Sequence, residues 1–194
     1  NKNSLLINEN LDLAQFSNEN NDERYFACVK DMILESLDLT SKEKMIDFGK
    51  GGSSRLAGDL ADNFTDVVSE KIDQVQIPTT REKADLILLH SNFLESLPNP
   101  KSTLTKIINN LCKPKNSLIF LSTSFDWNEN ITDSKNWMGG YKKDAENYFS
   151  SQGVKEFFEE NEFRLIKKDR LPFEVPNGDG SSKVYQENVF VFGR

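Results

Sequence analysis

The stretch Met45-Ile46-Asp47-Phe48-Gly49-Lys50-Gly51-Gly52-Ser53-Ser54 joins a short apolar run to a glycine-rich turn. Residues 45–48 are typical of a buried strand, and the glycines that follow let the backbone turn sharply and approach a ligand closely. Ser53 and Ser54 then open a helix whose apolar residues share one face, namely Leu56, Ala57, Leu60 and Ala61. The stretch therefore predicts a strand, a tight turn and a helix, which together make the first unit of an α/β sheet.

Strands and helices alternate through most of the chain around this unit. Upstream, residues 1–40 are predicted as an N-terminal helical segment, in which apolar side chains recur at helical spacing: Phe26, Val29, Ile33 and Leu37. Downstream, apolar runs predict strands at 65–69, 84–89 and 117–122, and helical spacing predicts helices around 104–111 and 154–158. This alternation is typical of a mainly parallel sheet with helices on both faces.

The chain closes with two strands that have no clear helix between them. They are predicted at 163–168 and 188–192, and the turn-rich segment 176–180 lies in their connection. Because there is no crossover helix, we expect the two strands to form a hairpin at or near one edge of the sheet. The sequence thus predicts a single α/β domain over 1–194, mostly parallel, with a C-terminal antiparallel strand pair.

The charge and length of the chain exclude several classes of function. Its 194 residues carry 24 basic and 31 acidic side chains, and its pI is near 4.9. A nucleic-acid binder needs clustered Lys and Arg for the phosphates, so we expect no nucleic-acid partner. No apolar run approaches the ~20 residues that span a bilayer, so we expect no membrane partner. The sequence leaves the oligomeric state open.

Cysteine and histidine usage restricts the metal and redox chemistry. The chain has two cysteines, Cys28 and Cys112, and one histidine, His90. These numbers exclude a disulfide framework, a zinc site of cysteines alone and a histidine-rich metal site, so we predict no bound metal. Residues 1–15 have a broken apolar pattern with one Lys, unlike a signal peptide. Because reduced thiols are typical of the cytoplasm, we expect a cytoplasmic protein.

Ligand chemistry is expected at the carboxyl end of the first strand. In an open α/β sheet a ligand binds at the carboxyl ends of the strands, near the point where the strand order reverses. The turn at 49–52 lacks the closing Gly-Lys-Ser/Thr of a Walker loop, and its glycines do not follow G-x-G-x-x-G. A diphosphate is therefore not the favoured ligand. The alternative is that residues 49–52 form only a tight strand–helix turn.

Asp47, Gly49 and Gly51 fit the D-x-G-x-G turn of class I methyltransferases that use S-adenosylmethionine. This resemblance implies a Rossmann-like fold and S-adenosylmethionine as the cofactor. It also implies that Asp47 lies near the amino-acid end of the cofactor. The glycines of the turn, Gly49, Gly51 and Gly52, are then expected to line its adenosine.

Two further polar residues follow strands that we expect beside the first one. In the methyltransferase family a second acidic residue, at the end of strand two, accepts hydrogen bonds from the ribose hydroxyls. Glu70 is the candidate for that role here, and its alternative is a solvated residue beside Lys71. His90 ends the third parallel strand and is a further cofactor-binding candidate. A lone histidine at a strand end is more often a hydrogen-bonded wall residue, and that alternative stays open.

A more specific pattern follows the strand at 117–122. Trp127, Trp137-Met138-Gly139-Gly140 and Lys143-Asp144-Ala145 come after it at fixed spacing. This arrangement resembles the C-terminal 4-mercaptohistidine N-methyltransferase domain of the ovothiol-biosynthesis enzymes. In that family the strand runs into Tyr-x-Trp, an acidic stretch, Trp-Leu-Gly-Gly and Lys-Asp-Gly. Asn92-Phe93-Leu94 and Asp47-Phe48-Gly49 extend the resemblance, which covers most of residues 24–194.

This resemblance implies methyl transfer from S-adenosylmethionine to a nitrogen of a small thiol-imidazole amino acid. The residues that it places around this small-molecule acceptor are Asn92, Trp127, Trp137, Gly139, Gly140, Lys143 and Asp144. Residues 125–148 are predicted to form a lid or acceptor-side loop, because long irregular loops in compact domains are usually functional or disordered. The alternative is that Trp127 and Trp137 are core aromatics. No catalytic base is assigned, since a neutral imidazole nitrogen already offers a lone pair.

The chain also departs from the family pattern. Phe125 stands where the family has Tyr, and Lys115-Asn116 stands where a Gly-Gly is common. Only residues 71–83 separate Glu70 from Ala84, which is too few for another strand and a second crossover. Either the cofactor pocket is reduced, or a segment between Ile72 and Ala84 is missing from the sequence.

Two other functions therefore stay open beside this one. The first is a degenerate methyltransferase fold that has lost catalysis and acts as a binding protein, which the short 71–83 segment favours. The second is a methyltransferase that acts on a different small molecule. Thermal stabilisation by S-adenosylhomocysteine would separate an intact cofactor site from a degenerate one.

Overall fold

The computed structural model describes residues 5–6, 21–48, 55–70, 82–90 and 92–194. Its main feature is a six-stranded sheet in the order β3-β2-β4-β5-β9-β8. Strands β2 (Lys44–Asp47), β3 (Asp66–Ser69), β4 (Leu86–Leu89) and β5 (Leu118–Thr123) run parallel. Strands β8 (Arg164–Pro176) and β9 (Ser182–Gly193) pair antiparallel, and β9 pairs antiparallel with β5. This arrangement confirms the predicted mostly parallel sheet with an antiparallel C-terminal pair at one edge.

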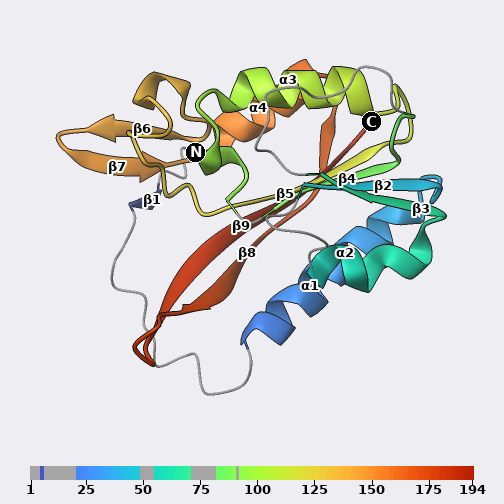
Figure 1. Cartoon of the computed structure of the whole chain (residues 1–194). Coiled ribbons are helices and arrows are strands. Elements are labelled where there is room, and N and C mark those ends of the chain that lie inside the picture. The colour runs from blue at the N-terminus through green and yellow to red at the C-terminus, as the bar shows by residue number, and fades with distance from the viewer. Residues whose placement is uncertain (1–4, 7–20, 49–54, 71–81, 91) are drawn as a thin grey trace.

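Helices cover both faces of this sheet, as the alternation predicts. Figure 1 shows α1 (Asn21–Leu37) and α2 (Arg55–Leu60) on one face, and α3 (Pro100–Leu111) and α4 (Gln152–Glu160) on the other. The start of α3 illustrates how the sequence fixes an element. The side chain of Asn99 accepts a hydrogen bond from the Ser102 backbone N–H at 3.2 Å, and Pro100 occupies the first helical position. The described residues also form short 3-10 helices, namely η2 (Ala61–Asn63), η3 (Leu94–Ser96) and η4 (Ser134–Asn136).

The core consists of two apolar layers that the sheet separates. Successive side chains of β4 alternate between them, so that Ile87 and Leu89 pack toward α3 and α4, while Leu86 and Leu88 pack toward α1 and α2. Each of these four side chains has no exposed surface. The central strands are therefore buried on both faces, which explains their continuous apolar sequence.

The C-terminal hairpin is longer than the sequence pattern predicts. We expected strands at 163–168 and 188–192, but β8 and β9 continue to Pro176 and Ser182, and Figure 1 shows them extending past the rest of the sheet. The predicted turn at 176–180 does lie at the tip of this hairpin. The extension lacks a long apolar run because helix α1 covers it on one side, where Tyr25 contacts Phe173 edge to face at 5.0 Å.

A second, smaller sheet was not predicted. Strands β1 (Leu5–Leu6), β7 (Glu146–Phe149) and β6 (Gly140–Lys143) pair antiparallel. The β6–β7 hairpin falls almost wholly in the stretch 125–148 that we expected to be irregular, and β1 falls in the segment 1–40 that was predicted to be helical, so that prediction was wrong for residues 5–6. A two-residue turn joins β6 to β7, with positive φ at both Asp144 (52°) and Ala145 (63°). Such turns normally carry Asn-Gly or Asp-Gly, so the alanine removed the usual sequence signal of a hairpin.

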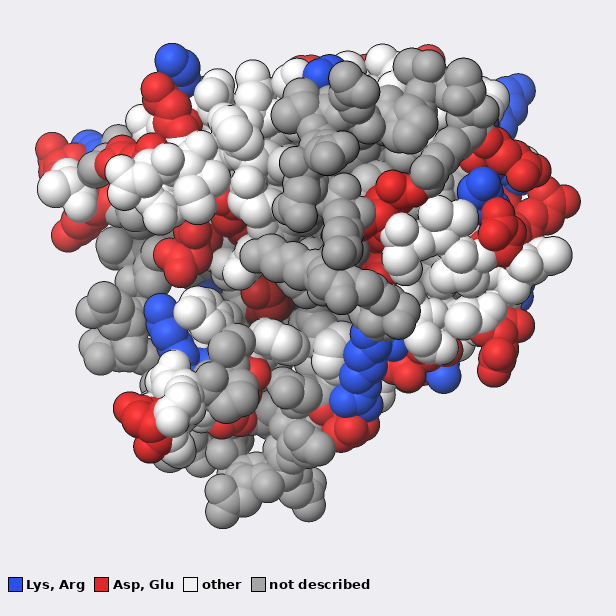
Figure 2. Space-filling model, in the orientation of Figure 1, with Lys and Arg blue, Asp and Glu red and all other residues white. Residues whose placement is uncertain are grey.

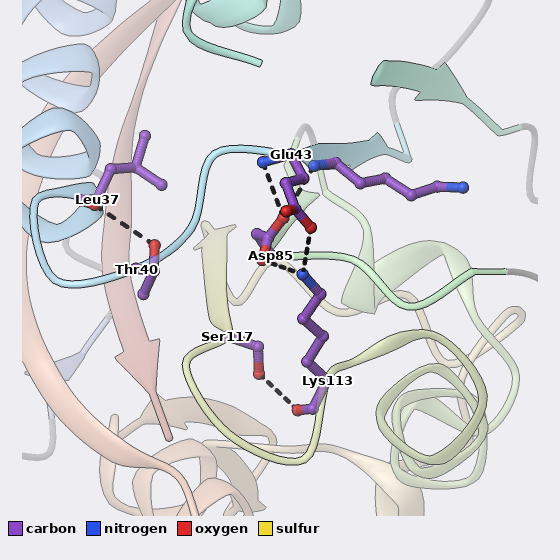
Figure 3. Close-up of polar contacts among 7 residues, drawn as sticks. Leu37, Thr40, Glu43, Asp85, Lys113 and Ser117 are labelled. Atoms are coloured by element: carbon purple, nitrogen blue, oxygen red, sulfur yellow. Dashed lines mark hydrogen bonds and ion pairs between the residues drawn. The ribbon is translucent and has the colours of Figure 1, made fainter. Parts of the chain in front are cut away.

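A buried carboxylate joins the amino ends of the central strands (Figure 3). Asp85, which has no exposed surface, accepts hydrogen bonds from the backbone N–H groups of Glu43 at 3.0 Å and Lys44 at 2.9 Å. The ammonium group of Lys113 donates to the other carboxylate oxygen at 2.7 Å. This hydrogen bond raises the pKa of Lys113. The side chain of Asp85 thereby links the start of β2 and the start of β4 to Lys113, which lies in the segment between α3 and β5.

Replacing this carboxylate is expected to destabilise the fold. The Asp85→Ala variant leaves two backbone N–H groups without their acceptor and removes one of the two carboxylate partners of Lys113. Each buried unsatisfied donor costs ~1–3 kcal/mol. We expect the free energy of unfolding, measured by urea denaturation, to fall by at least about 2 kcal/mol. The Lys42→Ala variant removes an exposed ion pair with Asp38, so it should change stability by less than about 1 kcal/mol. Equal effects of the two variants would contradict this role of Asp85.

Candidate functional site

The strand order reverses between β2 and β4, and two predicted site residues meet there. The chain passes from β2 to β3 on one side and then returns to β4 on the other side of β2. Asp47 is the last residue of β2, and His90 directly follows β4. The His90 Nε2 atom lies 2.6 Å from Asp47 Oδ1. The exposed fractions are 6% for His90 and 0% for Asp47, so this contact is shielded from water.

Glu70 lies beside this pair at the end of the neighbouring strand. It follows β3, it is half-buried, and its backbone N–H donates to the Asp47 carbonyl at 2.8 Å. The sheet therefore brings Asp47, Glu70 and His90 together at the carboxyl ends of three adjacent strands. The contact with Asp47 agrees with the hydrogen-bonded wall alternative for His90, and cofactor binding by all three residues stays a prediction. Gly49, Gly51 and Gly52 lie outside the described residues.

Asn92, which was predicted to lie around the acceptor, follows the end of β4 and is hydrogen-bonded to a residue that follows β5. Its φ of 59° lies in the left-handed region, which asparagine tolerates better than most residues. The Ser124 hydroxyl, just past β5, donates to Asn92 Oδ1 at 3.1 Å. Asn92 is exposed, so its amide lies at the surface of this edge of the sheet.

A buried glutamate that was not among the predicted site residues, Glu95, is hydrogen-bonded to the end of β5 and to the residue Phe125 beyond it. Glu95 Oε1 accepts hydrogen bonds from the Thr123 hydroxyl and from the Phe125 backbone N–H, the latter at 2.9 Å. Burial raises the pKa of Glu95. Phe125 is itself buried and has a φ of 56°, a strained conformation for a bulky residue. The sequence signal for this arrangement was an acidic residue inside the apolar run 93–97.

Trp127 and Trp137 stack on each other and belong to the core layer under α3 and α4. Their ring centroids are 6.1 Å apart with an angle of 9° between the planes, and their exposed fractions are 6% and 7%. Trp137 Nε1 donates to the Thr132 carbonyl at 2.9 Å, and the Thr132 hydroxyl donates to the Leu97 carbonyl at 2.6 Å. Both indoles are thus as buried as we would expect for core aromatics, which was the alternative interpretation of these residues. That the segment 125–148 forms a lid stays a prediction.

The remaining acceptor-side candidates are spread along the β6–β7 hairpin. Gly139 precedes β6 with a φ of 75°, and its carbonyl accepts a hydrogen bond from Ser150 N at 2.6 Å. Gly140 is the first residue of β6. Lys143 and Asp144 are exposed at the turn, at the far end of the hairpin from Gly139 (Figure 1). The structure therefore places Gly139 against the protein body and the Lys143-Asp144 pair at a surface tip.

The glycine at position 139 is required by packing. A Cβ atom there would lie 2.5 Å from the Ser150 carbonyl oxygen and 2.6 Å from Cε1 of the Phe125 ring. Real Cβ atoms do not approach neighbours so closely, and the positive φ adds strain for any side chain. Gly139 thus lets the strained Phe125 pack against the start of the hairpin.

A further pocket lies at the opposite edge of the sheet. It has a volume of about 340 Å³ and is lined by Asp38, Leu39, Thr40, Ser41, Asp85, Lys113, Lys115 and Asn116. These residues surround the amino ends of β4 and β5, where Lys113 is already paired with Asp85 and Glu43. This pocket is therefore separate from the edge that carries Asp47 and His90.

On the face shown in Figure 2, acidic and basic side chains of the described residues are interspersed. Within the described part of the chain, none of the helices combines the length and apolar composition needed to cross a membrane.

Comparison with known proteins identifies the fold. Neither a family model nor a curated protein sequence matches the chain. Among solved structures, it is similar to a SAM-dependent methyltransferase from Methanosarcina mazei, with 12% identity and a TM-score of 0.52 over 82% of this chain and 95% of that one. The N-methyltransferase NodS from Bradyrhizobium japonicum matches with 10% identity and a TM-score of 0.54, over 91% of this chain and 98% of that one.

A third similar structure was solved in connection with the conversion of a disulfide bond into a thioacetal group during echinomycin biosynthesis. It matches with 12% identity and a TM-score of 0.54, over 84% of this chain and 80% of that one. At such low identity these matches show the fold alone, and they confirm the predicted Rossmann-like class I methyltransferase fold. They do not support the narrower resemblance to the mercaptohistidine methyltransferases.

Substituting the packed glycine tests how the acceptor-side loop is held. We expect Gly139→Ala to lower the free energy of unfolding by more than about 2 kcal/mol, because overpacking alone costs ~1–3 kcal/mol and the left-handed φ adds ~1 kcal/mol. The matched control is Gly58→Ala in helix α2, where a Cβ atom meets nothing within 4 Å. That variant should be neutral or stabilising by up to ~1 kcal/mol. Chemical denaturation of both variants decides the point, and a harmless Gly139→Ala would contradict the packing role.

Proposed function

We propose that this chain is an S-adenosylmethionine-dependent methyltransferase that acts on a small molecule. The observation that carries the proposal is the meeting of Asp47, Glu70 and His90 at the carboxyl ends of three adjacent strands, where the strand order reverses. Open α/β sheets bind their ligands at this position. The fold and the methyltransferases of the same fold support the assignment.

The chemistry of these side chains fits the proposed cofactor. S-adenosylmethionine supplies a methyl group on a positively charged sulfur. Its ribose hydroxyls and its ammonium group are hydrogen-bond donors, and the carboxylates of Asp47 and Glu70 are acceptors. In this proposal Glu70 accepts from the ribose, Asp47 lies toward the amino-acid end, and His90 fixes the orientation of the Asp47 carboxylate through their 2.6 Å contact.

The acceptor would lie on the side of β4 and β5, against residues that follow these strands. We propose that it is a small molecule methylated on nitrogen, and that a thiol-imidazole amino acid is one candidate. Asn92 offers an exposed amide there, held by Ser124. The segment 125–148 would cover this side as a lid or acceptor-side loop, and its two stacked indoles would supply its packed base.

A degenerate, non-catalytic binding protein is the second candidate. The observation in its favour is the edge of the sheet beyond Glu70. Strand β3 has no further neighbour among the described residues, and three of its four side chains are exposed. The part of the cofactor site that lies beyond strand two would then be reduced, as the short 71–83 segment indicates.

We also propose that the protein works in a reducing compartment, as expected for the cytoplasm. Cys28 and Cys112 are both free thiols. Burial raises the pKa of Cys112 to about 12, so this thiol stays protonated and unreactive at neutral pH. Neither cysteine is needed for the proposed site.

Binding of S-adenosylhomocysteine, the demethylated product of the cofactor, tests the proposal directly. A ligand at 100 times its dissociation constant stabilises a protein by about 2.7 kcal/mol, which for this size raises the melting temperature by roughly 5–10 °C. We expect such a shift in a thermal denaturation assay. The absence of any shift up to millimolar ligand would favour the degenerate alternative.

A single-residue variant tests where the cofactor binds. Glu70→Gln keeps the backbone contact with Asp47 but removes the carboxylate, and a hydrogen bond to a charged group contributes ~1.5–3 kcal/mol. We therefore expect the affinity for S-adenosylhomocysteine, measured by titration calorimetry, to fall at least about tenfold. The control is Glu160→Gln, an exposed residue at the end of α4, which should bind as the parent does. Unchanged binding by Glu70→Gln would remove Glu70 from the site.

A further inference from the structure

The tip of the β8–β9 hairpin carries the one Asn-Gly pair of the sequence, Asn177-Gly178. The hairpin extends past the rest of the sheet (Figure 1), and residues 177–183 at its tip are all exposed. Asparagine is a thermolabile residue, because the backbone nitrogen of the next residue can attack its side-chain amide. A following glycine has no side chain to shield that nitrogen. The tip therefore combines the residue pair and the exposure that this reaction needs.

The attacking group, the backbone nitrogen of Gly178, is not held by the fold. Its N–H has no hydrogen-bond partner in the described part of the chain. Other backbone groups of the tip are bonded, since Asn177 N–H donates to the Ser181 carbonyl at 2.7 Å and Gly180 N–H donates to the Asn177 carbonyl at 3.3 Å. A Cβ atom at Gly178 would meet nothing within 4 Å. The nitrogen can thus reach the amide without breaking a hydrogen bond or meeting a neighbouring side chain.

The side-chain amide of Asn177 takes part in a short chain of exposed hydrogen bonds. Its Nδ2 donates to Ser181 Oγ at 2.9 Å, and the Ser181 hydroxyl donates to Asp179 Oδ1. The hydrogen bonds from Ser181 lower the pKa of Asp179, which is therefore ionised at neutral pH. This chain closes the tip only while residue 177 is a donor, because the Ser181 hydroxyl is already turned toward Asp179.

A second asparagine before a small residue provides an internal comparison. Asn116 is exposed and precedes Ser117, but the Ser117 side of the pair is locked. Ser117 has no exposed surface, and its backbone N–H donates to the Arg194 carbonyl at 3.1 Å, while Arg194 N–H donates back at 3.1 Å. Attack on Asn116 must break a buried hydrogen bond and pass a side chain. The fold therefore protects Asn116 and leaves Asn177 reactive.

We propose that Asn177 is a site of spontaneous deamidation, and that its conversion opens the tip of the β8–β9 hairpin. The Gly178 nitrogen forms a bond to Asn177 Cγ, and the bond from Cγ to Nδ2 breaks. Nδ2 leaves as ammonia with the proton that the Gly178 nitrogen gives up, and a cyclic imide remains. Water then opens the ring at either carbonyl. One product is aspartate, and the other is isoaspartate, in which the main chain continues through Cγ. Water is the only co-reactant.

Both products lose the hydrogen bond that closes the tip. A carboxylate at position 177 is an acceptor only, so it cannot donate to Ser181 Oγ. It also adds a negative charge beside the ionised Asp179, and like charges across a hairpin are destabilising. In isoaspartate the extra main-chain carbon further disturbs the pairing of Pro176 with Ser182 next to the tip. This inference goes beyond the proposed function, because it requires neither cofactor nor acceptor.

Peptide mapping of the aged full chain measures the reaction. The protein is incubated in buffer at pH 6 and at pH 8, digested, and analysed by mass spectrometry. We expect the Asn177 peptide to gain the mass difference between an amide and a carboxyl group, and to separate into two products. The rate should be higher at pH 8, because the nitrogen attacks after losing its proton. Breaking a buried hydrogen bond should make Asn116 react at least about tenfold more slowly. Equal rates at the two positions, or an unchanged Asn177, would overturn the proposal.

A glycine variant tests the route of attack. Gly178→Ala adds a methyl group beside the attacking nitrogen, in open space and at a position outside the left-handed φ region. We expect this variant to fold as the parent does and to deamidate several-fold more slowly. The matched control is Gly58→Ala, which also meets nothing within 4 Å and should leave the rate at Asn177 unchanged. If Gly178→Ala reacts as fast as the parent, the Gly178 nitrogen is not the attacking group.

Hydrogen exchange tests the opening of the tip. Asn177→Asp reproduces one product, and the backbone N–H groups at positions 177 and 180 should lose protection against exchange in this variant. Asn130→Asp adds the same charge at another exposed turn and should leave these two groups as they are in the parent. Unchanged protection at the tip in Asn177→Asp would show that deamidation does not open the hairpin. None of these measurements depends on S-adenosylmethionine, so their failure leaves the proposed function untouched.

Discussion

The burial of β2, β4 and β5 on both faces is the constraint on which the rest of this structure depends. Strands covered by helices on two sides exclude polar side chains from their middles, so ionisable groups are confined to their ends. Asp85 lies at the amino ends, where it is fully satisfied by two backbone N–H groups and Lys113. Asp47 and His90 lie at the carboxyl ends, where they pair with each other. The amino ends are therefore linked by structural hydrogen bonds, and the carboxyl ends carry the candidate site.

The loops at the carboxyl edge are held by positions of unusual backbone geometry. Asn92 and Phe125 both have positive φ, and each is fixed by a side-chain contact that spans the gap between β4 and β5. Gly139 supplies the space into which the Phe125 ring packs. Strained backbone persists only where the surroundings over-determine it, and such positions cluster at ligand sites. The loops at this edge, where we propose that the acceptor binds, are thus fixed by packing.

The sequence predicts those parts of the site that follow from strand ends. Asp47, Glu70 and His90 could be placed together because parallel strands bring their carboxyl ends to one edge, whatever the lengths of the connections. Glu95 had only a weak sequence signal, as an acidic residue within the apolar run 93–97, because its partner Thr123 is distant in the chain. Glu187 had none, because its environment comes from residues distant in the chain, such as Tyr25. The β6–β7 hairpin was missed for a local reason, since Ala145 occupies a position where glycine would signal the turn.

The two edges of the sheet use carboxylates in opposite ways, and this difference has an energetic meaning. Asp85 lowers the free energy of the folded state because each of its oxygens has a donor. Glu187 differs, because its buried Oε2 has no hydrogen-bond partner among the described residues, and burial followed by the charge of Glu95 raises its pKa. A fold that needed only stability would have an apolar residue or a donor at that position. Glu187 lies near the end of β5, because its neighbour Asn188 pairs with Thr123, at the edge of the sheet that also carries Asp47 and His90.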